Sequence, residues 1–347
     1  MVDQKSFPPQ QEGRFYLSEG GTETELMYKH GFELPHFAMF PLLDNPDAVS
    51  KMREMFRSYL DVAAKHNICA LMGGLDYRAS PDWGELLGYS PQGLADANLQ
   101  SIEFLREIAN EYATKISDIL IQGLIGPRGD AYEKNKSITA NEAEDYHSVQ
   151  LETLKKANVD LALAITFNNI PESIGVARSA AKIGVPLGIS LALDSSSKLN
   201  SGPSLAEAII TIDKATGQSP EFYSINCSHP VEYEPAIEPG EWINRVRGIR
   251  PNASKMDKMA LSQIGHLEEG DPIELGELCG DLAKRYPHID IWGGCCGTWS
   301  NHLDEIAKNV LAVKKTISRN LTIESCRITN ACRQTSKTLL ATRHSSI

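Results

Sequence analysis

The strongest constraint on the fold is the regular alternation of apolar, strand-like runs with amphipathic, helix-like runs along the chain. Eight such alternations follow one another without a break in composition, and no solenoid repeat interrupts them. Parallel strands joined by helices predict a (β/α)8 TIM barrel, in which the loops after the strands form the active site. The predicted strands are residues 15–17, 68–72, 119–125, 161–167, 186–193, 222–227, 251–254 and 289–292.

Helix signals fill the intervals between these strands. Asn45 and Pro46 begin a long amphipathic helix, and Thr139 with Glu142 forms a capping box at the start of another. The barrel is expected to span residues 14–315 as a single domain, between a flexible leader, residues 1–13, and a polar tail, residues 316–347. Further helices are expected at residues 95–112, 204–216, 242–249, 272–286 and 299–313.

Two adjacent cysteines stand where the last predicted strand turns. Cys295 and Cys296 lie in the run GGCCGT at residues 293–298. A disulfide between the two would be strained, because neighbouring Cα atoms are only about 3.8 Å apart. The flanking glycines allow the backbone to bring both thiols to one point, so a shared metal is the easier arrangement.

A third thiol, Cys227, ends the predicted strand 222–227 and is followed by a polar turn closed by Pro230. Both thiol sites therefore lie at the carboxyl ends of strands, which share one face of a parallel barrel. Three thiolates and one exchangeable position have the composition of an open zinc site, which binds a substrate thiol and holds it deprotonated. Buried and chemically inert cysteines are the alternative, since free Cys is among the most buried residue types.

Three segments carry a resemblance to a known family. Asn226-Cys227, the GGCCGT run and the run EGGTETEL at residues 19–26 together resemble the homocysteine S-methyltransferase family. The resemblance covers residues 14–315 and implies a (β/α)8 barrel. It also implies that Cys227, Cys295 and Cys296 bind zinc and form the catalytic site, where the zinc activates the sulfur of homocysteine.

Four further residues are candidates for substrate binding. Glu19 ends the first predicted strand, where the family usually has an aspartate, and Asp76 lies in the loop after the second strand. Thr166 keeps its family position at the end of the fourth strand, and Asn226 directly precedes Cys227. A role in a turn, a cap or the core is the competing interpretation for these positions.

Ile165 is the main departure from the family pattern. Relatives usually carry a glutamate at this place, which contacts the amino group of homocysteine in the family. Because a buried ammonium without its carboxylate partner is costly, the sequence predicts weaker binding of homocysteine here than in relatives. Thiols without an amino group are expected to compete better, and the identity of the acceptor stays open.

Charge and composition limit the classes of partner and the cellular locations to be expected. The 347-residue chain has a formal net charge of -11 and no long basic run, which disfavours a nucleic-acid partner. No apolar run is long enough for a membrane span, and the N-terminus lacks the apolar core of a signal peptide, so the expected location is the cytoplasm. Seven cysteines fit reduced thiols better than a disulfide framework, and Cys326 and Cys332 in the tail have no assigned role.

Two functions from different classes agree with these features. The first is an enzyme that moves a methyl group from a small onium or sulfonium donor to a zinc-bound thiol such as homocysteine, giving methionine. The second is a zinc- or thiol-binding barrel of the same family that has changed substrate or lost methyl transfer. A doubly wound dinucleotide enzyme is disfavoured, because no GxGxxG run follows the first strand. The expected partners are a small-molecule thiol and a methyl donor; S-methylmethionine, S-adenosylmethionine and betaine stay open as donors, and so does the oligomeric state.

Overall fold

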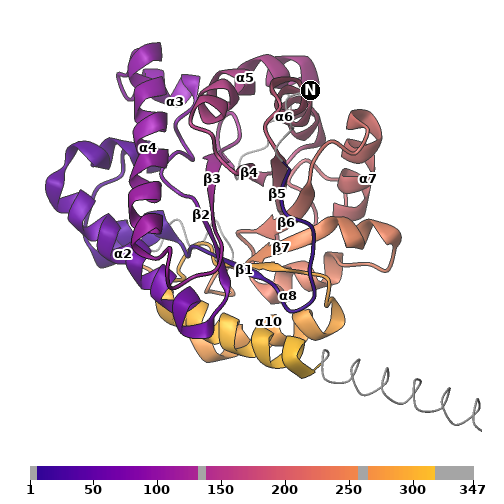
Figure 1. Ribbon diagram of the computed structural model, residues 1–347. Helices are drawn as coiled ribbons and strands as arrows, with labels where there is room; N and C mark the ends of the chain where they lie inside the picture. Colours follow the sequence, from indigo (N-terminus) through magenta and orange to yellow (C-terminus); the bar gives the residue numbers. More distant parts are fainter. Residues whose placement is uncertain (1–5, 132–137, 257–264, 317–347) are drawn as a thin grey trace, which may run out of the picture.

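Eight parallel strands close into a barrel in the order of the sequence (Figure 1). The computed structural model describes residues 6–131, 138–256 and 265–316. The first and last strands pair directly, Tyr16 with Ile291 and Leu17 with Trp292, which closes the sheet without an exposed edge. The predicted single-domain (β/α)8 TIM barrel is confirmed. The strands are β1 (Tyr16–Ser18), β2 (Cys69–Met72), β3 (Ile119–Ile125), β4 (Leu161–Phe167), β5 (Leu187–Ala192), β6 (Phe222–Asn226), β7 (Val246–Arg250) and β8 (Ile291–Trp292).

Helices surround the barrel and connect its strands (Figure 1). The longer ones are α2 (Pro46–His66), α3 (Pro81–Leu86), α4 (Pro91–Glu111), α5 (Ala140–Lys156), α6 (Ile170–Ile183), α7 (Leu205–Thr216), α10 (Pro272–Arg285) and residues 300–316. Short helical turns in the loops include α1 (Thr22–Thr24), η1 (Glu25–Lys29), α8 (Pro230–Tyr233) and η5 (Glu241–Arg245).

Local side chains set where several helices begin. Asn45 accepts hydrogen bonds from two backbone N–H groups in the first turn of α2. The capping box of Thr139 and Glu142 is present at α5, and Ser204 caps α7. These contacts satisfy N–H groups that have no partner inside the helix, so the predicted starts of all three helices are confirmed.

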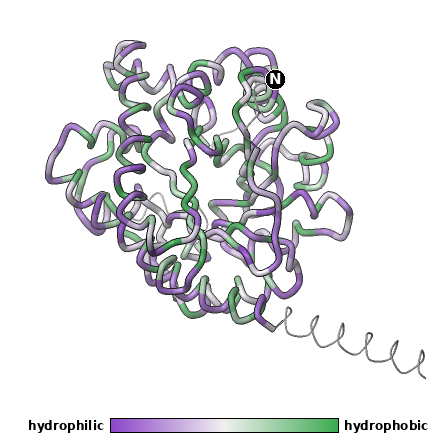
Figure 2. Tube along the Cα trace, viewed as in Figure 1, coloured by the Kyte–Doolittle hydropathy of each residue, from purple (hydrophilic) through white to green (hydrophobic). Residues whose placement is uncertain are grey.

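Hydrophobic side chains fill two layers, one between strands and helices and one within the barrel. Figure 2 shows the hydrophobic colour concentrated on the central strands, whereas the surrounding helices alternate between hydrophilic and hydrophobic residues. The inner layer includes Tyr16, Leu71, Leu163, Phe222 and Ile291. Since the inside of the barrel is packed, ligands bind at its ends, and the carboxyl ends of the strands form the functional face.

One aromatic side chain of the leader packs against the barrel. Phe7 is buried, and its ring lies 5.1 Å from Phe222 and 5.6 Å from Tyr16, centroid to centroid. Arg247 donates to the carbonyl of Pro8. Phe7 therefore anchors the leader at one point, while residues 9–13 are exposed, and the flexible leader stays a prediction. The expected tail, with Cys326 and Cys332, lies outside the described residues apart from residue 316.

The seventh strand corrects one sequence prediction. Residues 242–249 were expected to form a helix, with the strand at 251–254. Instead, η5 ends at Arg245 and β7 runs from Val246 to Arg250. The two arginines of this strand are both paired inside the protein. Arg247 binds Asp290 through two hydrogen bonds of 2.6 and 2.9 Å, and Arg250 pairs with Glu19 at 2.6 Å.

No helix among the described residues is both long enough and apolar enough to cross a membrane.

Candidate metal and substrate site

The three predicted cysteines meet at the carboxyl ends of β6 and β8. Cys227 directly follows β6, while Cys295 and Cys296 lie in the turn after β8. Their Sγ atoms all lie within 4.8 Å of one another. In the part of the chain that the structure describes, this is the one group of three Cys, His, Asp or Glu side chains with such a spacing.

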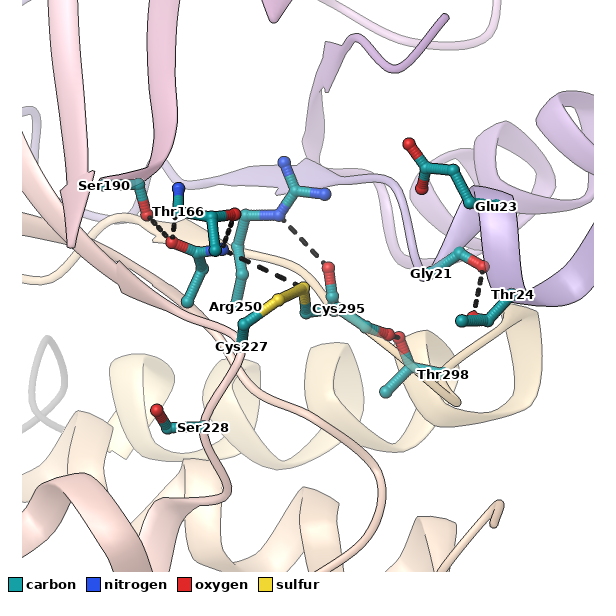
Figure 3. Close-up of a disulfide and its surroundings, with 12 residues drawn as sticks. Gly21, Glu23, Thr24, Thr166, Ser190, Cys227, Ser228, Arg250, Cys295 and Thr298 are labelled. Carbon is teal, nitrogen blue, oxygen red and sulfur yellow. Dashed lines mark hydrogen bonds between the residues drawn. A yellow bond between two sulfur atoms is a disulfide. The ribbon is translucent and has the colours of Figure 1, made fainter. Parts of the chain in front are cut away.

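Cys227 and Cys295 are joined as a disulfide in this structure, with Cα atoms 5.5 Å apart, and Cys296 is outside the bond (Figure 3). Two sulfurs that converge on one point are also close enough to bond to each other. Because metals bind the thiolate, both cysteines must be reduced before they act as ligands.

Close packing between two loops fixes the position of the thiol turn. A Cβ atom added to Gly21 would lie 2.5 Å from the carbonyl oxygen of Cys295, so the loop after β1 requires glycine at this contact. Gly297 has a φ of +81°, which favours glycine. The hydroxyl of Thr298 donates to the Cys295 carbonyl at 2.7 Å, and Thr24 Oγ1 accepts from the backbone N–H of Gly297 at 3.1 Å.

Asn226 connects three strands next to the thiols. Its Nδ2 donates to Thr166 Oγ1 at 2.9 Å and contacts Cys295 Sγ at 3.9 Å. Its Oδ1 accepts from Ser190 Oγ at 2.7 Å and from the backbone N–H of Thr166 at 3.2 Å (Figure 3). With its amide fully engaged, Asn226 orients Cys295 and Thr166 and has little left to offer a substrate.

Two strand ends beside the cavity have unusual backbone conformations. Thr166 has a φ of 64° and Cys227 a φ of 53°. Left-handed conformations of residues other than glycine cost about 1–3 kcal/mol, and they cluster at functional sites. Here the hydrogen bonds of Asn226 hold Thr166 in place. Both residues line the cavity described below, so the strain falls where a ligand would bind.

The sulfur cluster fits a zinc ion by the chemistry of its donors. Thiolates are soft ligands that select zinc among the common divalent metals, and three protein ligands leave a fourth position for a substrate. Cys227 is buried and Cys296 is partly exposed, so the cluster lies at the boundary between the core and the cavity. Asn226, beside Cys295 Sγ, provides the kind of outer contact that orients a metal ligand.

A cavity of about 380 Å³ opens beside the cysteines. This volume lies in the range of small-molecule sites, roughly 300–1,000 Å³. All three cysteines and Thr166 line it, as does the loop after β1 from Gly20 to Thr24. Its apolar and aromatic lining comprises Met27, Tyr28, Phe37, Tyr77, Leu124, Ile165 and Leu267.

Glu19 lies beside this cavity, but its carboxylate binds other parts of the protein. Oε1 is 2.6 Å from Arg250 Nη1 in a buried ion pair. Oε2 accepts from the backbone N–H of Gly73 at 3.1 Å, and Gln122 Nε2 contacts Oε1 at 3.5 Å. The backbone carbonyl of Glu19 accepts from the N–H of Gly294, next to Cys295, at 3.0 Å, while its side-chain charge is largely used for joining β1, β2 and β7.

Asp76 is fully buried and does not line the cavity. Its Oδ1 accepts from the backbone N–H of Leu124 at 3.0 Å, and its Oδ2 has no hydrogen-bond partner among the described residues. Burial raises the pKa of Asp76 to about 7. The structure thus places this predicted substrate residue in the support of the strand ends.

Two charged residues at the cavity had no distinguishing sequence signal. Glu23 stands in a polar run after β1, and Arg250 ends a strand that the sequence placed elsewhere. Both line the cavity, together with Ile165. Arg250 also donates from Nε to the carbonyl of Gly294, next to Cys295, at 3.1 Å. A barrel model with the correct seventh strand would have revealed Arg250; nothing in the sequence alone singles out Glu23.

Fold and site together define a TIM-barrel protein with three converging thiols at a cavity of small-molecule size. Residues 16–310 match the family described as Homocysteine S-methyltransferase. Because this match covers most of the chain, the protein belongs to the homocysteine S-methyltransferase family and is an S-methyltransferase with small-molecule substrates. No curated protein sequence matches the chain.

Solved structures agree with the fold. The homocysteine methyltransferase MmuM from Escherichia coli, in its metallated form, has a TM-score of 0.65 and 19% identity, over 85% of this chain and 96% of that one. Its oxidized form has a TM-score of 0.66 and 19% identity, over 85% and 95% of the two chains. Its apo form has a TM-score of 0.60 and 18% identity, over the same shares. At an identity of 18–19%, the similarity shows that the folds agree.

Proposed function

We propose that this protein is a zinc-dependent methyltransferase that moves a methyl group from a small onium or sulfonium donor to a thiol such as homocysteine, giving methionine. The observation that carries the proposal is the convergence of Cys227, Cys295 and Cys296 within 4.8 Å at a cavity of about 380 Å³. Family membership supplies the reaction class. The match to a protein described in a metallated form supports a metal at the thiols.

Cys227, Cys295 and Cys296 would hold the ion. Zinc, when bound, lowers the pKa of a thiol at its open position and so supplies a thiolate nucleophile at neutral pH. Asn226, which contacts Cys295 Sγ, and Thr298, which donates to the Cys295 carbonyl, would orient Cys295 as a ligand. These contacts pre-organise the site before any substrate arrives.

The remaining step needs alignment more than further catalytic groups. The acceptor sulfur attacks the methyl carbon of the donor, a C–S bond forms, and the bond to the onium atom breaks with its electron pair going to that atom. The aromatic rings of Tyr28, Phe37 and Tyr77 line the cavity, and such rings favour a cationic donor over a neutral product. Holding both reactants in one cavity converts a bimolecular encounter into an oriented displacement.

The second candidate is a barrel that binds zinc and thiols but has changed substrate or lost methyl transfer. Ile165 favours it, because this apolar side chain lines the cavity where a charged contact to the acceptor is expected. In either case we propose a cytoplasmic protein, and methionine synthesis as the role of the first candidate.

Metal analysis and a methyl-transfer assay separate the two candidates. We expect the reduced protein to bind zinc in a one-to-one ratio and to methylate homocysteine or a related thiol with S-methylmethionine, S-adenosylmethionine or betaine. Zinc binding without transfer from any of these donors would support the second candidate. Absence of zinc in the reduced protein, loaded and dialysed, would contradict both.

A further inference from the structure

An acceptor with an amino group needs a carboxylate beside the cysteines, and the predicted positions do not offer one. Ile165 is apolar. Asp76 is buried and does not line the cavity. Glu19 is held by Arg250, the N–H of Gly73 and Gln122. None of these three positions provides a free carboxylate to the cavity.

Two other acidic residues line the cavity, and each already has an interaction partner within the protein. Glu268 is hydrogen bonded to His266 at 2.9 Å. Asp130 also has an interaction partner. The side chains of His266 and Glu268 are 63% and 38% exposed, so solvent would screen a ligand charge bound there.

Glu23 is the carboxylate in the cavity that is placed to bind an ammonium group. It lies on α1, lines the cavity, and in Figure 3 extends to the same side of the Cys227–Cys295 pair as the Arg250 guanidinium. The hydroxyl of the adjacent Thr22 donates to Oε2 at 2.9 Å. Burial raises the pKa of Glu23, because the cavity solvates its carboxylate poorly, and a cation bound beside it would favour the charged form.

The local charges support the same role. Arg250 forms the buried ion pair with Glu19 at 2.6 Å and also attracts Glu23 at longer range. Arg78, the other arginine at the cavity, donates to the carbonyl of Gly129 at 2.7 Å, and no ion pair among the described residues holds the carboxylate charge of Glu23. A ligand cation at Glu23 would balance it, because a charge in a poorly solvated cavity is stable only when paired.

We infer that Glu23 binds the ammonium group of an amino-acid thiol and thereby determines which acceptor the enzyme prefers. The inference rests on the proposed function and names the acceptor class of that site. It also revises the expectation drawn from Ile165, because the carboxylate comes from the loop after β1 and not from the end of β4. A thiol without an ammonium leaves Glu23 unpaired in the cavity, so homocysteine should be favoured over its deamino analogue.

The test compares homocysteine with γ-mercaptobutyrate, which differs from it only by the missing amino group. Binding of both thiols is measured by calorimetry on the reduced, zinc-loaded protein, for the wild type, Glu23→Gln, Glu23→Asp and Glu268→Gln. Glu23→Gln should weaken homocysteine roughly tenfold or more, since a hydrogen bond between charged groups is lost, and should change γ-mercaptobutyrate little. Glu23→Asp should retain part of the preference. Glu268→Gln is the matched control, with the same change of charge in the same cavity, and should leave the ratio of the two affinities nearly unchanged.

Three results would overturn the inference. The first is a wild-type protein that binds homocysteine no more tightly than γ-mercaptobutyrate. The second is an equal loss of both thiols in Glu23→Gln with zinc content and circular dichroism unchanged. The third is a raised KM for the donor with acceptor binding intact, which would assign Glu23 to the donor. A wild type that binds homocysteine through Glu23 but transfers no methyl group would instead refute the proposed function and leave this inference standing.

Discussion

Two sides of the same barrel end use their polar residues differently. At the carboxyl ends of β6 and β8, three thiols converge and face a cavity. At the ends of β1 and β2, the carboxylates of Glu19 and Asp76 accept hydrogen bonds from neighbouring strands and loops. Both sets of residues stand at strand ends, where a TIM barrel forms its active site. Of these two sets of residues, only the thiols line the cavity.

The difference follows from the cost of burial. A thiol behaves as a small hydrophobic group and can be buried without partners. A carboxylate must be paired, hydrogen bonded or protonated when it leaves water. Glu19 therefore recruits Arg250 and the N–H of Gly73, while Asp76 has its pKa raised to about 7. For a carboxylate, a position at a strand end does not by itself indicate contact with substrate.

Removal of a thiol should have the largest effect. We expect Cys227→Ala and Cys295→Ala to lose zinc and methyl transfer, because two ligands cannot replace three. The barrel has its own core, so both variants should remain folded by circular dichroism. Cys279→Ala is the matched control: this thiol is buried in α10 away from the cavity, and its loss should leave zinc content unchanged. Full zinc content in both site variants would contradict the comparison.

Glu19→Gln should act on stability more than on metal binding. The variant leaves Arg250 without its buried partner, and breaking such a pair costs about 3–5 kcal/mol. Chemical denaturation measures this loss, and zinc content should not change. The same substitution at Glu54, whose pair with Lys51 is exposed, should have little effect on stability. A Glu19→Gln protein with unchanged stability but weakened substrate binding would show that Glu19 contacts the substrate.

Asp76 should make stability depend on pH. Its pKa rises from 3.8 to about 7 on folding, so between these values the folded protein keeps a proton that the unfolded chain has lost. Stability should therefore decrease as pH rises from about 4 to about 7, by at most about 4 kcal/mol at about 1.4 kcal/mol per pKa unit, and should level off above that.

Asp76→Asn removes the titration while keeping an oxygen for the N–H of Leu124. Denaturation of the wild type and the variant across this pH range gives the comparison, and the stability curves should converge at acidic pH. Parallel curves would show that Asp76 is charged in the folded protein.

Much of the fold followed from the sequence because its signals are local. The capping box at Thr139 and the apolar runs at 119–125 and 161–167 each depend on neighbouring residues only. The seventh strand was misplaced because its two arginines are neutralised by Asp290 and Glu19, which are distant in sequence. Such partners become visible only when the barrel closes.

For the site as well, the features with a local sequence signal could be predicted and those that depend on distant residues could not. The thiols could be found because Cys295 and Cys296 stand in a glycine-rich turn and Cys227 ends a predicted strand before Pro230. The roles of Glu19 and Asp76 depended on donors from other strands, such as Gly73 and Leu124, which the sequence does not link to them. Glu23 lies in a run of polar residues, where nothing local distinguishes a carboxylate in the cavity from one in solvent.

X-ray absorption at the zinc edge tests the central claim most directly. The protein is first reduced, so that the Cys227–Cys295 bond is open, and is then loaded with zinc. The account predicts three sulfur ligands from the protein, rising to four when homocysteine is added, with one proton released per thiol bound at neutral pH. Fewer than three sulfur ligands before addition, or no new sulfur ligand after it, would contradict the account.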